Sequence, residues 1–364
     1  MMIKKLWMKS VLAVAAASLI FFSCSKDNAG NGNGNTDDTK DFKIGMLTNY
    51  ADVIIIPGYN DLKTKLDQLD ALVNAFLTAP SATTQQAASA SFKSAYLSFE
   101  GVSVANFGPA SSLLMNNYIN TFPCVPSKIE NGIITGTYSF TQPVASDSIQ
   151  GFPTLDYLLF SDNAVQKFAD AGAANRKKYV QDVLTRMRSL VTDVLSQWNG
   201  AYRNTFINST ETNVGSSIAY LVNQFAFEMD ALKGPRIGWP FGKQSNGIVF
   251  ADKCEGYYSG ITGALAVANL TSLKNYYNGG SGNGVADYLV KLKKEALNTE
   301  VSGQFDIALN ALKAIPDPMS DAFNNNKTAV ENAYKEVQKL LTLLKTDVAS
   351  ATAVQITYMD NDGD

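Results

Sequence analysis

The chain of 364 residues contains no histidine. Histidine is the commonest metal ligand among side chains and the usual general base near neutral pH. Its absence excludes zinc sites built on histidine, and it excludes serine–histidine and cysteine–histidine nucleophile systems within this chain. Any catalysis would have to rest on carboxylates, lysine, tyrosine or serine–lysine pairs.

Cysteine is also scarce, with three residues in the whole chain. Cys24 lies near the N-terminus, whereas Cys124 and Cys254 lie far apart in the body. The last two could form a disulfide in an oxidising compartment, or they could remain as buried thiols. The sequence leaves both alternatives open.

Runs of basic residues are missing as well. The formal net charge is −3, from 30 basic and 33 acidic side chains. Three of the lysines and no acids lie in residues 1–23, so removing them leaves 27 basic against 33 acidic side chains, or −6. This acidic balance, without a basic block, argues against a nucleic-acid partner.

The N-terminus has the pattern of a lipoprotein signal. After a basic start, the apolar run 11–22 is shorter than the roughly 20 residues that a membrane-spanning helix needs, and it fits a secretory signal peptide. Ser23 then precedes Cys24, an order that resembles the bacterial lipobox, whose cysteine is lipid-modified. We therefore expect a signal peptide over 1–23 and a lipid on Cys24. The protein would then sit in the outer membrane and face the periplasm or the cell surface. An ordinary cleaved signal with an incidental cysteine is the alternative.

Residues 24–41 are rich in glycine, asparagine and aspartate and contain no aromatic residue before position 42. Such a segment cannot bury enough apolar surface to offset the entropy of ordering, so it is predicted to be a flexible tether.

Behind the tether, apolar residues recur at intervals of three and four, which predicts amphipathic helices and an all-α fold. Ser81 is expected to cap the helix that carries Phe92 and Phe99. Strand signals occur only at 133–140 and 355–359. The clearest apolar stripes are Leu62, Leu66, Leu69, Val73; Tyr179, Val183, Met187, Leu190, Val194; Ile218, Leu221, Phe225, Met229; and Val330, Tyr334, Val337, Leu341.

Two long stretches, 107–153 and 234–260, break the helical pattern and are rich in aromatic residues, glycine and proline. Long irregular segments in a compact domain are usually functional or disordered, and this composition favours function. Their motifs resemble those of the imelysin family. The matching segments are Asn49-Tyr50-Ala51-Asp52-Val53-Ile54; Phe107-Gly108-Pro109; Ile119-Asn120-Thr121-Phe122-Pro123 with Lys128-Ile129-Glu130; Arg236-Ile237-Gly238-Trp239-Pro240-Phe241-Gly242; and Glu255 with Tyr258-Ser259-Gly260.

The resemblance implies a helical envelope protein with two bundle-like halves, here 42–175 and 176–364. Members are often linked to iron uptake, and the family is named for a reported insulin-cleaving peptidase. Its hallmark is Gly-x-His-x-x-Glu. In this chain Gly151 keeps the glycine, but Pro153 replaces the histidine and Asp156 replaces the glutamate. Proline offers neither a side-chain ligand nor a backbone donor. The chemistry of the hallmark is therefore expected to be lost or altered.

The acids of the matching segments, Glu130, Asp156 and Glu255, could meet in one cleft, where hard cations accept such oxygen ligands. The alternative is that they cap helices or pair with neighbouring lysine and arginine residues. We expect no catalytic residue, no metal site and no cofactor. The candidate ligand cleft comprises Glu130, Arg236, Trp239, Glu255, Tyr258 and Ser259.

The leading hypothesis is a non-enzymatic, lipid-anchored envelope protein that binds a small ligand or a protein partner in iron or nutrient acquisition. One alternative is a metallopeptidase that uses carboxylates only. The other is a glycan-binding surface lipoprotein, suggested by aromatic residues such as Trp239 and Tyr257.

Overall fold

The computed structural model describes residues 36–358, so the predicted signal peptide, Cys24 and the last six residues lie outside the described part. Helices make up 75% of the model, and residues 36–358 contain no strand, which confirms the predicted all-α class. Both predicted strand segments are therefore wrong as far as they are described. Residues 133–135 instead end a helix, which stops at Gly136 because this glycine takes the left-handed conformation (φ +66°).

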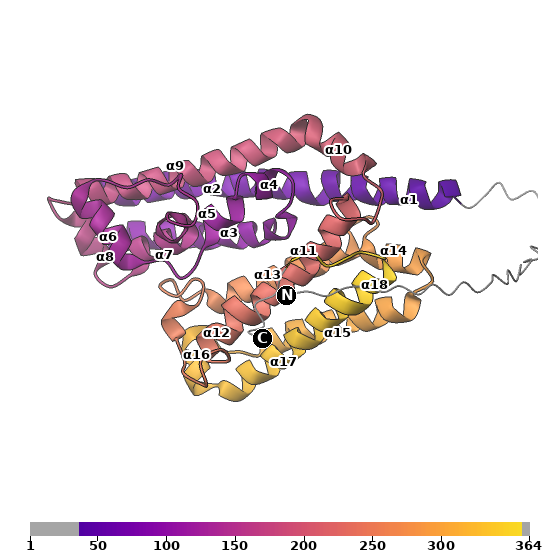
Figure 1. The fold of residues 1–364 in the computed structure, drawn as a ribbon. Coiled ribbons are helices and arrows are strands. Elements are labelled where there is room, and N and C mark those ends of the chain that lie inside the picture. Colours follow the sequence, from indigo (N-terminus) through magenta and orange to yellow (C-terminus); the bar gives the residue numbers. More distant parts are fainter. Residues whose placement is uncertain (1–35, 359–364) are drawn as a thin grey trace, which may run out of the picture.

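The first group of helices is built around three long ones that lie side by side, α2, α3 and α9 (Figure 1). Shorter helices cover this layer. The elements are α1 (Thr36–Asn49), η1 (Tyr50–Ile55), α2 (Ile56–Thr78), α3 (Ala82–Glu100), η2 (Ser103–Ala105), α4 (Pro109–Ser112), α5 (Met115–Asn120), α6 (Pro126–Thr135), η3 (Asp147–Ile149), α7 (Gly151–Phe160), α8 (Ala164–Ala169), α9 (Ala174–Gln197), η4 (Trp198–Tyr202) and α10 (Arg203–Asn208).

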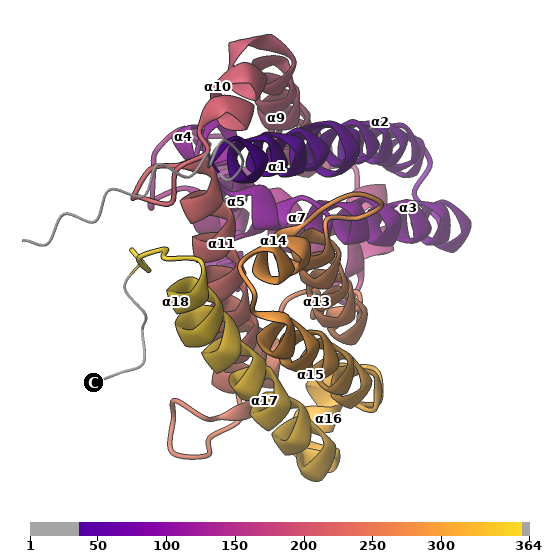
Figure 2. The ribbon, with the colours of Figure 1, turned by 90° about the vertical axis from the view of Figure 1, so that its right-hand side faces the viewer.

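The second group is a bundle in which α15 packs between α13 and α17, while α11 packs against α13 and α17 (Figure 2). Its elements are α11 (Ser217–Ala231), η5 (Leu232–Gly238), α12 (Trp239–Phe241), η6 (Ala251–Lys253), α13 (Thr262–Asn278), α14 (Val285–Lys291), α15 (Glu295–Lys313), α16 (Met319–Asn325), α17 (Lys327–Thr342), η7 (Leu343–Val348) and α18 (Ala349–Ala351).

The observed helices cross two of the expected boundaries, one between the halves and one at the end of the tether. Helix α9 packs on α2 and belongs with the first group, although the expected division between 175 and 176 falls at its start. Residues 36–41 are helical rather than part of a tether, because α1 continues from there to Met46 and Leu47, which are fully buried.

The two groups meet where α3 packs on α13 and where η2 contacts α11 and α13. Buried apolar side chains from both groups form one continuous core, so the junction is packed rather than open. No helix within residues 36–358 combines the length and the apolar composition needed to cross a membrane. The irregular segments singled out in the sequence contribute residues to this junction, and they carry the candidate site.

Candidate functional site

The hallmark segment forms the first turns of α7. Gly151 has φ +77°, and a Cβ placed there would lie 2.2 Å from the carbonyl oxygen of Ile119, so only glycine fits. Pro153 is the third residue of the helix, where its missing N–H is not needed.

Asp156 connects the two groups of helices. Its side chain is buried, and its carboxylate accepts hydrogen bonds from the backbone N–H of Tyr258 at 2.8 Å and of Ser259 at 3.0 Å. Burial raises the pKa of Asp156 to about 6, while the hydrogen bonds from Ser259 and Tyr258 oppose this rise. Each oxygen of this carboxylate accepts a hydrogen bond from one backbone N–H of the second group of helices. The residue that replaces the hallmark glutamate therefore acts as a bridge across the junction.

A small cavity of about 80 Å³ lies beside Asp156. Cys124 and Cys254 both line it, and both are buried free thiols. Burial raises the pKa of each thiol to about 12, so neither is a thiolate nucleophile near neutral pH. The volume suits a few water molecules and is well below the roughly 300 Å³ of the smallest typical ligand pockets.

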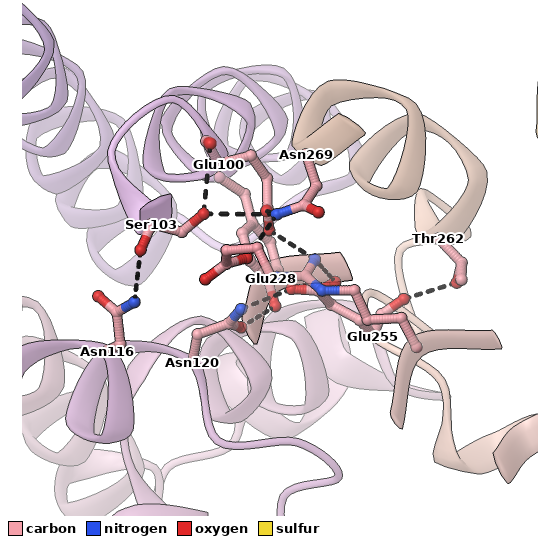
Figure 3. Close-up of polar contacts among 10 residues, drawn as sticks. Glu100, Ser103, Asn116, Asn120, Glu228, Glu255, Thr262 and Asn269 are labelled. Atoms are coloured by element: carbon pink, nitrogen blue, oxygen red, sulfur yellow. Dashed lines mark hydrogen bonds and ion pairs between the residues drawn. The ribbon is translucent and has the colours of Figure 1, made fainter. Parts of the chain in front are cut away.

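A buried polar group, which we call the junction cluster, comprises Glu100, Glu228, Arg236, Glu255 and Asn269 (Figure 3). Arg236 Nη1 donates to Glu100 Oε1 at 3.0 Å and also to Glu255 Oε2. Asn269 Nδ2 donates to Glu100 Oε2 and to Glu228 Oε2, at 2.9 Å in both cases. Helices α3, α11 and α13, together with η5 and the loop after η6, thus converge on one network.

The junction cluster holds three carboxyl groups and a single guanidinium group. Burial raises the pKa of Glu100 well above its ordinary value, and burial also raises the pKa of Glu228. Burial alone would lower the pKa of Arg236, but the carboxylates of Glu100 and Glu255 outweigh that effect and raise it. We therefore expect Arg236 to stay charged, and the buried carboxyl groups of Glu100 and Glu228 to hold their protons more tightly than exposed ones do.

Asn120 links the junction cluster to the hallmark helix. Its amide Nδ2 donates to Glu255 Oε1 at 2.6 Å, and its Oδ1 accepts a hydrogen bond from the Tyr96 hydroxyl group. The ring of Tyr96 stacks on Phe152 of α7, with centroids 4.3 Å apart. The hallmark segment and the cluster are thus parts of one packed polar junction.

The residues predicted to share one ligand cleft are divided among four places. Arg236 and Glu255 belong to the junction cluster, and the amides of Tyr258 and Ser259 bind Asp156. Glu130 instead forms an ion pair with Arg176 and accepts a hydrogen bond from the Tyr157 hydroxyl group at 2.7 Å. Trp239, at the start of α12, lines a separate pocket. The structure therefore does not bring Glu130 or Trp239 into the junction cluster with Arg236 and Glu255.

Sequence reasoning missed Glu100, Glu228 and Asn269, all of which are buried. A signal for them was present. Each lies within an apolar helical stripe rather than on a polar face: Glu228, for example, follows Phe225 by three positions and precedes Met229. Buried polar side chains are almost always hydrogen-bonded, so a carboxylate at such a position predicts a partner from another element.

The buried carboxylates at the junction are better placed to hold the two groups of helices together than to coordinate a metal ion. The carboxylate oxygens of Glu100 and Glu255 are engaged by Arg236, Asn269 or Asn120, and those of Asp156 by backbone amides. Within residues 36–358, no three histidine, cysteine, aspartate or glutamate side chains are placed so that they could hold a metal ion.

Comparison with known proteins agrees with this architecture. The chain is 22% identical over 320 residues to iron-regulated protein A of Synechococcus elongatus, a match that covers 83% of this chain and 85% of that one. A solved structure of a candidate iron-regulated protein A precursor from Parabacteroides distasonis superposes with a TM-score of 0.74 at 19% identity, covering 88% of this chain and 97% of that one. An imelysin-like protein from Psychrobacter arcticum gives a TM-score of 0.71 at 18% identity, covering 88% and 98%.

The two solved structures establish likeness of fold. The family model described as Imelysin matches residues 55–346, which is most of the chain. It spans the hallmark segment, the bridge made by Asp156 and the whole junction cluster. The chain therefore belongs to the imelysin family.

Proposed function

We propose that this protein is a non-catalytic imelysin-family protein, anchored to the outer membrane by a lipid on Cys24, that binds a small ligand or an envelope partner. One observation carries the non-catalytic part. Both carboxylate oxygens of Asp156 accept backbone hydrogen bonds from the other group of helices, so the replaced hallmark serves as a connection.

A role in iron or nutrient acquisition is the physiological setting that the comparisons favour. A relative that matches 83% of this chain carries the name iron-regulated protein A. The lipobox-like order of residues before Cys24 supports an envelope location. A binding protein held at the membrane would have access to nutrients that enter the envelope.

The carboxylate-only metallopeptidase is the second candidate. It would need an open cation site and a group that activates water. In a chain without histidine both would have to come from carboxylates, and the carboxylates at the junction accept hydrogen bonds from N–H donors. These contacts favour the non-catalytic proposal.

The deciding experiment is an assay of peptide cleavage with the purified full chain on an unfolded protein substrate, with Zn²⁺ or Fe³⁺ added. Calorimetric titration with each ion would run alongside, and the matched variant is Asp156→Asn, which keeps the size of the side chain. We expect no metal-dependent cleavage. Submicromolar binding or cleavage that disappears in Asp156→Asn would show that the altered hallmark still works.

The anchor is tested separately. Cells that express the chain would be fed a fatty-acid analogue, which should label the wild type and spare Cys24→Ala. Equal labelling of both would contradict the lipid anchor and would leave the cleavage result untouched.

A further inference from the structure

Two hollows adjoin along α11. Their volumes are about 310 and 380 Å³, within the range of roughly 300–1,000 Å³ that is typical of small-ligand sites. Phe227 and Tyr358 line both hollows, so the two lie next to each other, and we call them together the α11 groove. Neither Asp156 nor any member of the junction cluster lines it.

Aromatic rings line the end of the groove near α12. Phe122 comes from the first group of helices, whereas Trp239 and Phe227 come from the second. Phe227 is 39% exposed, and its ring meets that of Tyr358 edge to face at 5.7 Å. Phe122 and Trp239 are half-buried, and aromatic side chains gathered at a hollow in this way mark a binding surface. Their flat apolar faces match the C–H faces of sugar rings.

Uncharged hydrogen-bonding groups line the other end, among them Asn106, Ser111 and Gln224. Gln224 Oε1 is buried, and no group within residues 36–358 donates a hydrogen bond to it. An amide oxygen buried in this way costs free energy until a donor reaches it. A hydroxyl group of a bound ligand would supply that donor.

The charges of the residues that line the groove indicate which class of ligand it can bind. Apart from tyrosines, Asp230 and Lys233 are the ionisable residues that line the two hollows, and their charges are opposite. Recognition of a phosphorylated or uronic ligand calls for an excess of cationic donors, especially arginine. The lining therefore suits a ligand without net charge.

We propose that the α11 groove binds a neutral oligosaccharide. Sugar rings stack on Trp239 and Phe227, and sugar hydroxyl groups bind at Asn106 and Gln224. Two adjoining hollows give room for more than one ring. The proposal goes beyond the non-catalytic anchored role, because it names a ligand class and a separate site, and it requires neither the lipid nor the absence of peptidase activity.

Tryptophan fluorescence offers a direct probe. The chain has three tryptophans: Trp7 lies in the predicted signal peptide, Trp198 is fully buried, and Trp239 is partly exposed in the groove. The emission that disappears in Trp239→Phe belongs to Trp239. Quenching of this emission by acrylamide would be measured with neutral hexasaccharides of glucose, mannose, xylose and N-acetylglucosamine, and with hexagalacturonate as the charged comparison. We expect saturable protection by at least one neutral hexasaccharide and none by hexagalacturonate.

Calorimetry with the protecting hexasaccharide would then compare two variants. Phe227→Ala should weaken binding about tenfold, the loss expected for one stacking face. Tyr257→Ala is the matched control, since it removes a half-buried aromatic residue that lines the small cavity instead, and it should leave the affinity unchanged. Circular dichroism checks that both variants fold.

Three results would overturn the inference: no neutral hexasaccharide protects Trp239, hexagalacturonate alone protects it, or Tyr257→Ala weakens binding as much as Phe227→Ala. None of these results bears on the labelling of Cys24 or on the cleavage assay. Failure here can therefore be told apart from failure of the proposed function.

Discussion

Arg236→Met should be one of the most damaging single substitutions in the junction. The Arg236 side chain is 7% exposed and pairs with carboxylates of Glu100 and Glu255 that are 0% and 2% exposed. Removal of one partner of a buried ion pair costs about 3–5 kcal/mol, because the remaining charge is left without compensation. Here a single guanidinium group serves two such carboxylates. We therefore expect a loss of about 3–5 kcal/mol in the free energy of unfolding, measured by urea denaturation at pH 7.

The control is Arg188→Met. Arg188 pairs with Asp67 and Asp70, but its side chain is 38% exposed, so its loss should cost about 1 kcal/mol or less. The damage in Arg236→Met should also shrink as the pH falls from 8 to 5. Without the cation, the folded carboxyl groups bind protons more tightly than the unfolded ones, and uptake of those protons stabilises the folded state. Equal losses in the two variants, or a loss in Arg236→Met that does not change with pH, would refute this reasoning.

Three further outcomes are expected, all measured by urea unfolding. The raised pKa of Asp156, about 6 against an ordinary 3.8, means that its stabilising contribution is complete below pH 3.8 and is lost as the pH rises through 6. Asp156→Ala should therefore cost more at pH 4 than at pH 7. Gly151→Ala should lower the free energy of unfolding by about 3–5 kcal/mol, because position 151 has a left-handed φ and the added Cβ would clash with backbone. Gly303→Ala should raise it by up to about 1 kcal/mol, because the space around its Cβ is open. Glu228→Gln should lose less than about 1 kcal/mol at pH 7, since it removes an acid that burial already disfavours as an anion.

The helices themselves could be predicted because their burial follows a simple period. Leu62, Leu66, Leu69 and Val73 recur at helical spacing, and all four are fully buried in α2. Ser81 caps α3 as expected, since its side chain accepts a hydrogen bond from the Thr84 N–H at 3.2 Å. Which helices pack together was harder to predict, because an apolar stripe shows that a face is buried without showing which partner covers it. The stripe of α9, for example, does not show that this helix packs on α2.

The sequence identified separate segments of the site but not the contacts that join them. The motifs around Asp156 and Tyr258 were both identified, but the hydrogen bond that joins them connects residues 102 positions apart. No local pattern encodes such a pairing. Glu100 could have been noticed as an acid that follows the buried Phe99, yet its partner Arg236 lies 136 positions away and is placed by the packing of α3 against the second group. The position of a residue in an apolar stripe predicts that its side chain is buried. The packing of distant helices determines which side chain it pairs with.

The altered hallmark and the α11 groove are connected through the junction. Pro153 fits the first turn of α7, only glycine fits at position 151 beside Ile119, and the carboxylate of Asp156 reaches the second group of helices. The groove is lined by residues from both groups, Phe122 from the first and Trp239 from the second. Such a groove keeps its shape only if the two groups of helices stay in a fixed position relative to each other. A polar junction whose carboxylates accept hydrogen bonds from N–H donors of both groups meets that need.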